Sequence, residues 1–209
     1  MRLLKTEDNS YTCHNTEYDE HYHTKSGAIE EAFEKHVKPL GVANGMHILD
    51  FCFGLGYNGI AAFHDHRDIH VTALELDPEI IDMMKTIEPP KEIETEFNFF
   101  KDIGTKKEMT DSYGNYLKLI MGDAMQTIKD LPDDTFDVCF FDPFSPKKHP
   151  EMWSVSTVKQ IYRVLKKGGK LSTYSCARMV RDNLKEAGFL VTDGPIVGRR
   201  SPSTIAIKE

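Results

Sequence analysis

The stretch from Phe140 to Trp153 combines residue types that could carry out chemistry on an amine. Asp142 closes an apolar run, and a carboxylate there could orient an amine and take up its proton while the lone pair points along the bond that breaks in methyl transfer. In the loop that follows, Phe144 and Trp153 could stack on a flat base, and Lys147 could meet a phosphate. We therefore expect Asp142 to be catalytic. The alternative for Trp153 is an indole that fills the core beneath a rigid loop.

A glycine-rich turn upstream could hold a nucleotide cofactor. Gly54, Gly56 and Gly59 follow an apolar run within the segment 49–59 (LDFCFGLGYNG). This G-x-G-x-x-G spacing allows a tight turn whose backbone N–H groups approach a ligand closely. The spacing is shared by proteins that bind NAD, FAD or S-adenosylmethionine (SAM), so its meaning depends on the residues that follow.

Two acidic residues follow the turn in the order expected for a nucleotide site. Glu75 ends the next apolar run, about twenty residues on, where a carboxylate can accept both ribose hydroxyl hydrogens. Asp77 competes for this role, although it stands before a proline as a helix cap would. Asp123 and Ala124 follow the third run, where an acidic side chain can face an adenine amino group. Asp50 and the Gly-Asp-Ala segment favour SAM over NAD, and no hydride-transfer constellation is evident.

These residues stand at the ends of predicted strands that alternate with predicted helices. Strands are predicted at 47–53, 70–76, 116–122, 136–142, 170–176, 189–197 and 203–208. Helices are predicted from Ser26 to Pro39, after Tyr57, near Pro78, around 158–165 with an end at Gly168–Gly169, and at 178–187. Nearly all-apolar strands in such alternation indicate a parallel sheet covered on both faces.

We expect one α/β domain over 1–209 with a Rossmann-like class I SAM-dependent methyltransferase fold. Its sheet should be mostly parallel and seven-stranded, with an antiparallel terminal hairpin at the sheet edge. Residues 88–115 are charged and irregular and are expected to be an insertion.

Charge is distributed unevenly along the chain. The net charge of −7 argues by itself against a nucleic-acid partner, but residues 143–209 hold 13 Lys or Arg and only 5 Asp or Glu. This basic region could form a positive face for RNA, or it could be solvated helix surface without a ligand.

Several classes of protein are disfavoured. No apolar run reaches the roughly 18–20 residues of a membrane span, and the first residues lack an apolar signal core, so we expect no membrane association and a cytoplasmic protein. The 4 cysteines form no CxxC pair, which argues against disulfides and structural zinc. His64, His66 and His70 have no Cys or Glu at zinc-like spacing, so no metal is expected.

The stretch from Asp142 to Trp153 resembles the DxFxPxKNPxMW signature of the methyltransferase domain of tRNA 5-methylaminomethyl-2-thiouridine biosynthesis enzymes (MnmC-like) and its stand-alone relatives. Further segments follow the order of that family: 18–23 (YDEHYH), 27–31 (GAIEE), 53–58 (FGLGYN), 168–169 (GG), 173–177 (TYSCA), 180–181 (VR), 187–189 (AGF) and 198–200 (GRR). The resemblance covers most of the chain except 88–115.

The resemblance implies methyl transfer from SAM to the exocyclic amine of 5-aminomethyl(-2-thio)uridine, or a related 5-substituted uridine, at the wobble position of tRNA. Asp142 would sit beside that amine and the methionine part of SAM, and Phe144, Lys147 and Trp153 would contact the substrate. The N-terminal segment 1–45 would cover the cofactor site, and the tRNA anticodon loop would meet the basic region 143–209. The residues implied to bind the cofactor are Tyr22, Phe53, Gly54, Gly56, Asn58, Glu75, Leu76, Asp123, Ala124 and Asp142.

The sequence departs from the family at His149, which replaces the usual Asn, and the flavin-dependent oxidase partner domain is absent from this chain. These departures leave a different 5-substituent open. One alternative is a spermidine-synthase-like aminopropyltransferase that uses decarboxylated SAM, although its GGGDGG-like loop differs from 53–58. A second alternative is a non-catalytic RNA-binding module with the same fold, against which the intact turn, Glu75, Asp123 and Asp142 argue.

Overall fold

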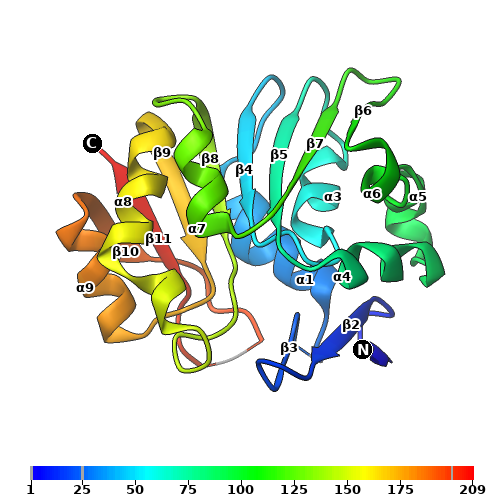
Figure 1. The fold of residues 1–209 in the computed structure, drawn as a ribbon, viewed down its shortest axis with the longest axis horizontal. Coiled ribbons are helices and arrows are strands. Elements are labelled where there is room, and N and C mark those ends of the chain that lie inside the picture. The colour runs from blue at the N-terminus through cyan, green and yellow to red at the C-terminus, as the bar shows by residue number, and fades with distance from the viewer. Residues whose placement is uncertain (1, 25, 199) are drawn as a thin grey trace.

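The computed structural model, which describes residues 2–24, 26–198 and 200–209, is built around one eight-stranded sheet (Figure 1). Its strands are β4 (His47–Phe51), β5 (His70–Glu75), β6 (Glu108–Thr110), β7 (Tyr116–Met121), β8 (Phe136–Phe141), β9 (Leu165–Thr173), β10 (Phe189–Asp193) and β11 (Thr204–Lys208). Their order across the sheet is β10-β11-β9-β8-β4-β5-β7-β6. The five central strands are parallel, whereas β6 and β11 run antiparallel to their neighbours. The expected mostly parallel α/β sheet with an antiparallel end is confirmed.

The central strands are apolar on both sides because both faces of the sheet are covered. In β8, Val138 and Phe140 pack into one core cluster, while Cys139 and Phe141 pack into the other. Successive side chains of a strand point to opposite faces. A continuous apolar run is therefore what a doubly covered strand requires.

Helices form a layer on each face of the sheet (Figure 1). One layer contains α1 (Ala28–Glu31), α2 (Lys38–Leu40), α3 (Tyr57–Phe63), α4 (Pro78–Met83), α5 (Glu94–Phe100) and α6 (Ile103–Lys106). The other contains α7 (Ala124–Thr127), α8 (Val155–Val164) and α9 (Arg178–Glu186). Short 3₁₀ turns are η2 (Met84–Thr86), η3 (Lys91–Ile93), η4 (Ile128–Asp130) and η5 (Pro150–Trp153). Within the described ranges, no helix is long and apolar enough to cross a membrane.

The N-terminal segment forms a small sheet of its own, β1 (Arg2–Lys5), β2 (Tyr11–Asn15) and β3 (Glu20–His21). In Figure 1 it lies beneath the lower, carboxyl ends of the parallel strands. The N–H of Tyr11 donates to the hydroxyl oxygen of Tyr57 at 3.0 Å, and Cys13 is buried in the same core cluster as Tyr57. The small sheet is thereby fastened to α3, the helix that follows the glycine turn.

The helix that was predicted to stop at Pro39 differs from the prediction in its middle and at its end. Between α1 and α2 the chain widens into a π-helical turn, η1 (Ala32–Val37), and the helix ends at Leu40, before Gly41 with φ 68°. Proline lacks an N–H and is tolerated in the first turn of a helix, which is its position in α2. The glycine, rather than the proline, ends the helix.

Residues 88–115 are ordered rather than irregular. They form η3, α5, α6 and β6, and the side chains of Ile93, Phe97, Phe100 and Ile103 are at most 1 % exposed. These apolar residues recur at helical spacing and cover the sheet. The charged residues around them obscure this spacing in the sequence. The segment also adds β6 as an eighth strand to the seven that the sequence predicts.

Two smaller differences lie near the C-terminus. β9 begins at Leu165, directly after α8, so Gly168 and Gly169 lie within the strand and do not end the helix. β11 lies between β9 and β10, so β10 is the outer strand of the hairpin at that edge of the sheet.

Candidate functional site

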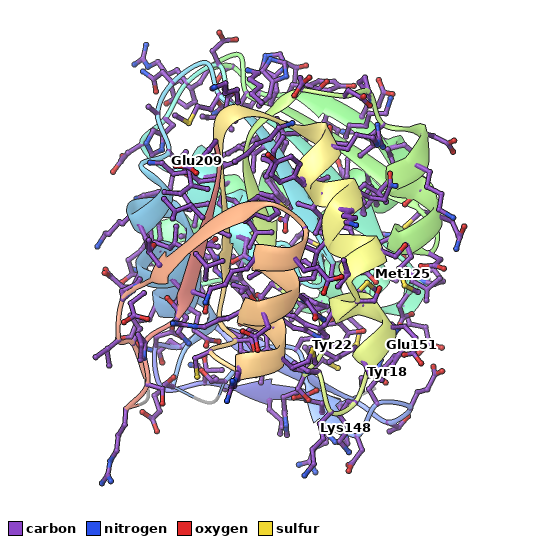
Figure 2. All side chains as sticks on the ribbon, turned by 90° about the vertical axis from the view of Figure 1, so that its left-hand side faces the viewer. Tyr18, Tyr22, Met125, Lys148, Glu151 and Glu209 are labelled. Atoms are coloured by element: carbon purple, nitrogen blue, oxygen red, sulfur yellow. The ribbon has the colours of Figure 1, made fainter. Side chains whose placement is uncertain are left out.

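A cavity of about 1040 Å³ opens at the carboxyl ends of the parallel strands. Most of its lining comes from the N-terminal segment 15–24, the strand ends near 75 and 123, and the loop after β8. Glu31, Cys52 and Tyr174 also contribute. Figure 2 shows Tyr18, Tyr22, Met125 and Lys148 gathered at this end of the molecule, far from Glu209. Open α/β sheets bind their ligands at this edge, and the volume suits a cofactor-sized ligand with part of a second molecule.

The glycine turn between β4 and α3 adopts a backbone that other residues resist. Gly54 (φ 57°) and Gly56 (φ 77°) are left-handed, and so is Cys52 (φ 69°), which lines the cavity. A methyl group on Gly56 would come within 2.6 Å of the Phe53 ring. The N–H of Gly54 donates to Oε2 of Glu75 at 2.7 Å, so the acidic residue after β5 holds the turn in place.

Glu75 has a structural role that the sequence does not reveal. Its Oε1 accepts the N–H groups of Leu76 at 2.8 Å and of Asp77 at 2.9 Å. Burial raises the pKa of this carboxyl, against the lowering by its three N–H donors. A carboxylate offers about four acceptor positions. Glu75 therefore retains about one for a ligand hydroxyl, fewer than the two expected.

Asp77 and Asp123 both cap helices at the cavity edge. Oδ1 of each accepts the N–H two residues further on, at 2.8 Å and 2.9 Å respectively. The Tyr22 hydroxyl donates to Oδ2 of Asp77 at 3.3 Å. Asp123 and Ala124 line the cavity, as does Leu76, whose side chain is exposed. Capping and ligand contact use different oxygens of Asp123 and are compatible.

Four residues expected to bind the cofactor are not part of the cavity lining: Phe53, Gly54, Gly56 and Asn58. Tyr22 covers the turn, because a methyl group on Gly54 would lie 3.1 Å from Cδ1 of the tyrosine. Phe53 and Asn58 are buried. These residues lie behind the cavity wall and support it, and Tyr22 lines the cavity in front of them.

Asp142 stands directly after β8 and lines the cavity. Its Oδ2 accepts a hydrogen bond from Nδ2 of Asn58 at 3.2 Å, and Nε2 of His36 lies 3.7 Å from the same oxygen. The side chain is 15 % exposed. Burial raises the pKa of Asp142, and the charge of Glu31 adds to this, whereas His23 and Asn58 act in the opposite direction. Oδ1 is the oxygen left for a ligand.

A buried ion pair borders Asp142. Lys35, 2 % exposed, pairs with Glu31 one helical turn before it. Oε2 of Glu31 accepts the N–H of Thr24 at 3.0 Å, and Glu31, Thr24 and His23 all line the cavity. Burial opposes ionisation of Glu31, but the charge of Lys35 leaves its pKa below the ordinary value. This pair fixes the segment that carries His23.

Two buried histidines face the same region. Burial lowers the pKa of His23 and lowers that of His36 to about 3, so both rings are neutral at pH 7. The backbone of His23 exchanges two hydrogen bonds with the hydroxyl of Thr12, at 2.9 and 3.1 Å. Nε2 of each ring is buried without a hydrogen-bond partner. His36 lies within the helix predicted from Ser26 to Pro39, and the sequence predicted no role for it in the site.

Trp153 is not at the cavity entrance. Its side chain is 0 % exposed and packs edge-on against Phe141 and Tyr174. Its Nε1 donates to the carbonyl oxygen of Phe144 at 2.9 Å. A fully buried indole cannot stack on a substrate, so the expected direct contact is wrong. The indole instead holds the loop that carries Phe144, which does line the cavity.

The basic residues after 142 are spread over the loop and the C-terminal elements. Lys147 is exposed and does not line the cavity, and Arg178 is 95 % exposed. Arg199 lies outside the described residues. Among the residues that the structure describes, no group of three or more His, Cys, Asp or Glu is placed to hold a metal ion.

A family model described as S-adenosyl-L-methionine-dependent methyltransferase matches residues 91–209. An uncharacterized protein of Methanocaldococcus jannaschii is 33 % identical over 215 residues, covering 99 % of this chain and 59 % of that protein. The bifunctional tRNA 5-methylaminomethyl-2-thiouridine biosynthesis protein MnmC of Leptospira interrogans is 28 % identical over 229 residues, covering 94 % of this chain and 34 % of that protein. The chain thus spans less than two thirds of the length of these two curated relatives.

Solved structures support the same grouping. The crystal structure of MnmC2 from Aquifex aeolicus is 27 % identical with a TM-score of 0.80, covering 98 % of this chain and 69 % of that one. A spermidine synthase is 12 % identical with a TM-score of 0.62, covering 100 % of this chain and 73 % of that one, which shows a shared fold alone.

Proposed function

The chain belongs to a family of S-adenosyl-L-methionine-dependent methyltransferases, and we propose that it methylates the exocyclic amine of 5-aminomethyluridine, its 2-thio form or a related 5-substituted uridine at the tRNA wobble position. Its fold is that of class I methyltransferases and its cofactor is SAM. The substrate proposal is supported by the similarity to proteins named for tRNA 5-methylaminomethyl-2-thiouridine biosynthesis.

The cavity wall has the chemistry that SAM requires. Glu75 can accept a ribose hydroxyl, Asp123 can accept an adenine amino hydrogen, and Ala124 leaves room for a flat ring beside it. Tyr22 and Leu76 line the same part of the cavity. We infer that these five residues hold the nucleoside of the cofactor, with Asp142 near its methionine part.

The observation that carries the proposal is the anchoring of Asp142. One carboxylate oxygen is bound by Asn58, the other is left for a ligand, and burial raises the pKa of the group. A carboxylate fixed in this way can accept a hydrogen of an amine and hold its nitrogen in one orientation. A raised pKa also makes it a stronger base than an ordinary aspartate.

The reaction needs an unprotonated amine. When bound, SAM supplies an electrophilic methyl group, and the electron pair of the broken carbon–sulfur bond stays on sulfur. The acceptor ammonium first loses a proton, which Oδ1 of Asp142 can accept and release to solvent. The freed lone pair of the nitrogen then forms the new nitrogen–carbon bond, and burial of the site keeps water from competing.

We further propose that tRNA approaches over the basic region 143–209, which includes exposed Lys147 in the loop that carries Phe144. Phe144 would contact the base and Lys147 a phosphate. Such a substrate implies action in the cytoplasm.

A second candidate is aminopropyl transfer from decarboxylated SAM. It is favoured by one observation, the two carboxylates of Glu31 and Asp142 on the same cavity wall, which could flank an amine. The pairing of Glu31 with Lys35 weakens it, since that carboxylate is already neutralised. Tighter binding of decarboxylated SAM than of SAM would favour this candidate.

The test is transfer of labelled methyl from SAM to tRNA carrying 5-aminomethyluridine, followed by mass analysis of its nucleosides. We expect one methyl group on that nucleoside, and loss of transfer with retained SAM binding in Asp142→Asn. Asp102→Asn, at the exposed N-terminal end of α6, is the matched control. Binding of SAM without transfer to any 5-substituted uridine would overturn the substrate proposal and leave the methyltransferase assignment in place.

A further inference from the structure

Three aromatic rings from two distant segments are stacked at the cavity. The ring of Tyr18 lies parallel to that of Phe144, with centroids 4.7 Å apart and planes at 23°. It lies equally flat against His149, at 5.0 Å and 25°. All three residues are half-buried and line the cavity. Tyr18 thus offers its flat faces to two rings of the loop after β8.

The position of these rings relates them to the chemistry at Asp142. Phe144 is two residues after Asp142, and the Trp153 indole fixes its carbonyl oxygen. A flat group stacked on Phe144 would therefore carry its substituents within reach of the carboxylate. The stacked arrangement of a tyrosine ring is also that of a nucleobase on aromatic side chains, which tolerates any flat π-system.

The turn that carries Tyr18 is held mainly by local and exposed contacts. Within the turn, the N–H of Tyr18 donates to Oδ1 of Asn15 at 3.1 Å. Asp19 pairs with Lys148 at 3.1 Å, with side chains 76 % and 38 % exposed, and its other carboxylate oxygen lies 3.3 Å from Nε2 of His14. Oε2 of Glu20 accepts the N–H of Ser145 at 2.8 Å. Exposed ion pairs stabilise little, and Asp19 has a left-handed backbone (φ 49°) that costs free energy outside glycine. The turn that carries Tyr18 can thus move away at small cost.

We propose that Phe144 and His149 form a stacking site for the acceptor nucleobase, and that Tyr18 occupies this site until the base displaces it. The proposal rests on the proposed function, because it supplies the base whose amine meets Asp142. It assigns a role to His149, the position at which the sequence departs from the family it resembles. In this proposal, the segment 18–20 competes with the substrate base for the stacking site and does not help to bind the base.

The alternative arrangement, in which Tyr18 stays in place and contacts the base, predicts the opposite sign for one variant. If Tyr18 competes, Tyr18→Ala removes the competitor and binding becomes tighter. If Tyr18 contributes to the wall, the same change weakens binding. His149→Ala weakens binding in either case, so the sign of the Tyr18 variant decides.

The experiment is equilibrium dialysis of an anticodon stem-loop RNA carrying 5-aminomethyluridine against the SAM-bound protein, with methyl transfer measured on the same samples. For Tyr18→Ala we expect a Kd severalfold lower than that of the wild type, and for Tyr18→Phe a wild-type Kd because the ring remains. For His149→Ala we expect a Kd about fivefold higher or more, from the loss of one stacking ring. Tyr113→Ala removes an exposed tyrosine far from the cavity and is the matched control.

A Kd for Tyr18→Ala that is equal to or higher than the wild-type value overturns the proposal, provided that thermal unfolding and SAM binding are unchanged. If Tyr18→Ala gives that result while the wild type transfers methyl, only the stacking proposal is wrong. If the variants change the Kd of the stem-loop as expected but the wild type transfers no methyl, only the proposed function is wrong. RNA binding that is absent in every variant overturns both.

Discussion

Nε2 of His36 lies 3.7 Å from Oδ2 of Asp142, and Nδ1 of the same ring is 2.8 Å from the hydroxyl of Ser172. His36 and Ser172 are 0 % exposed, so neither contacts substrate. The imidazole is neutral. We expect the Ser172 hydroxyl to donate to Nδ1, which would put the ring proton on Nε2, facing the carboxylate. The distance is longer than a hydrogen bond, and such contacts in ligand-free sites often tighten when the reacting groups bind.

His36→Leu should move the acid limb of the pH profile of kcat, which reports the substrate-bound enzyme, to higher pH. Asp142 must be ionised to accept a proton, and removal of a donor facing its carboxylate raises its pKa further. The expected shift is about one pH unit, the worth of a hydrogen bond to a charged group. The other titratable groups that face Asp142 stay in place, namely His23, Glu31, Lys35 and Asp50. His36→Gln keeps a donor and should retain the profile, and an unmoved limb in His36→Leu would show that the ring only fills space.

Asp142→Asn should stabilise the protein at neutral pH while it abolishes transfer. The folded-state pKa of Asp142 is raised above its ordinary value of 3.8, mainly by burial. The stability that this carboxyl contributes to the folded state is therefore fully present below pH 3.8. It is lost as the pH rises through the folded-state pKa. The amide removes this loss, so Tm should rise by roughly 2–4 °C at pH 7 for each kcal/mol recovered, with no gain near pH 4. Thermal unfolding at both pH values checks this, and a gain independent of pH would contradict it.

Lys35→Met should be among the most destabilising single substitutions in the chain. It leaves the Glu31 carboxylate buried without its cation, a change that costs about 3–5 kcal/mol in other proteins. Adding Glu31→Leu should restore most of the loss, because two apolar side chains replace the pair. Urea unfolding of the single and double variants measures both. Lys38→Met, in the exposed pair with Glu34 on the same helix, is the control and should change little.

The fold could be predicted from the sequence where apolar runs were uninterrupted. β8 and β5 were expected almost to the residue because doubly covered strands are apolar throughout. The segment 88–115 could not be, because Phe97 and Phe100 are surrounded by Glu and Lys that mask their spacing. The π-helical turn that brings Lys35, His36 and Val37 inward leaves no recognised sequence signature.

The site was only partly predictable for a related reason. Three site residues stand at the ends of predicted strands: Asp142, Glu75 and Asp123. Their positions follow from the strands themselves, which the sequence predicts. His23 and Glu31 reach the same cavity through packing of the N-terminal sheet, a contact between segments far apart in sequence. For Trp153 the sequence left two roles open, contact with the substrate and filling of the core, and its full burial supports the second.

Binding of tRNA should depend on salt through the basic region. Lys147→Gln, Arg178→Gln and Arg200→Gln each remove an exposed cation from 143–209. If each meets a phosphate, each should lower the slope of log Kd against log salt by roughly 0.7–0.9. Titrations at several salt concentrations measure this slope. Lys91→Gln, exposed in the acidic part of the chain, should leave it unchanged, and unchanged slopes in all variants would place the RNA on another face.

The interior position of β11 has a consequence for how the chain reaches its native state. β10 precedes β11 in the sequence, yet β10 has no partner in the sheet except β11, which pairs with β9 on its other side. Until residues 204–208 insert, β9 remains an open edge and β10 has nothing to join. A growing chain therefore exposes an unpaired, aggregation-prone edge until residues 204–208 have left the ribosome. Removal of those five residues would eliminate both the β9–β11 and the β10–β11 hydrogen-bond ladders. This short segment therefore completes the sheet.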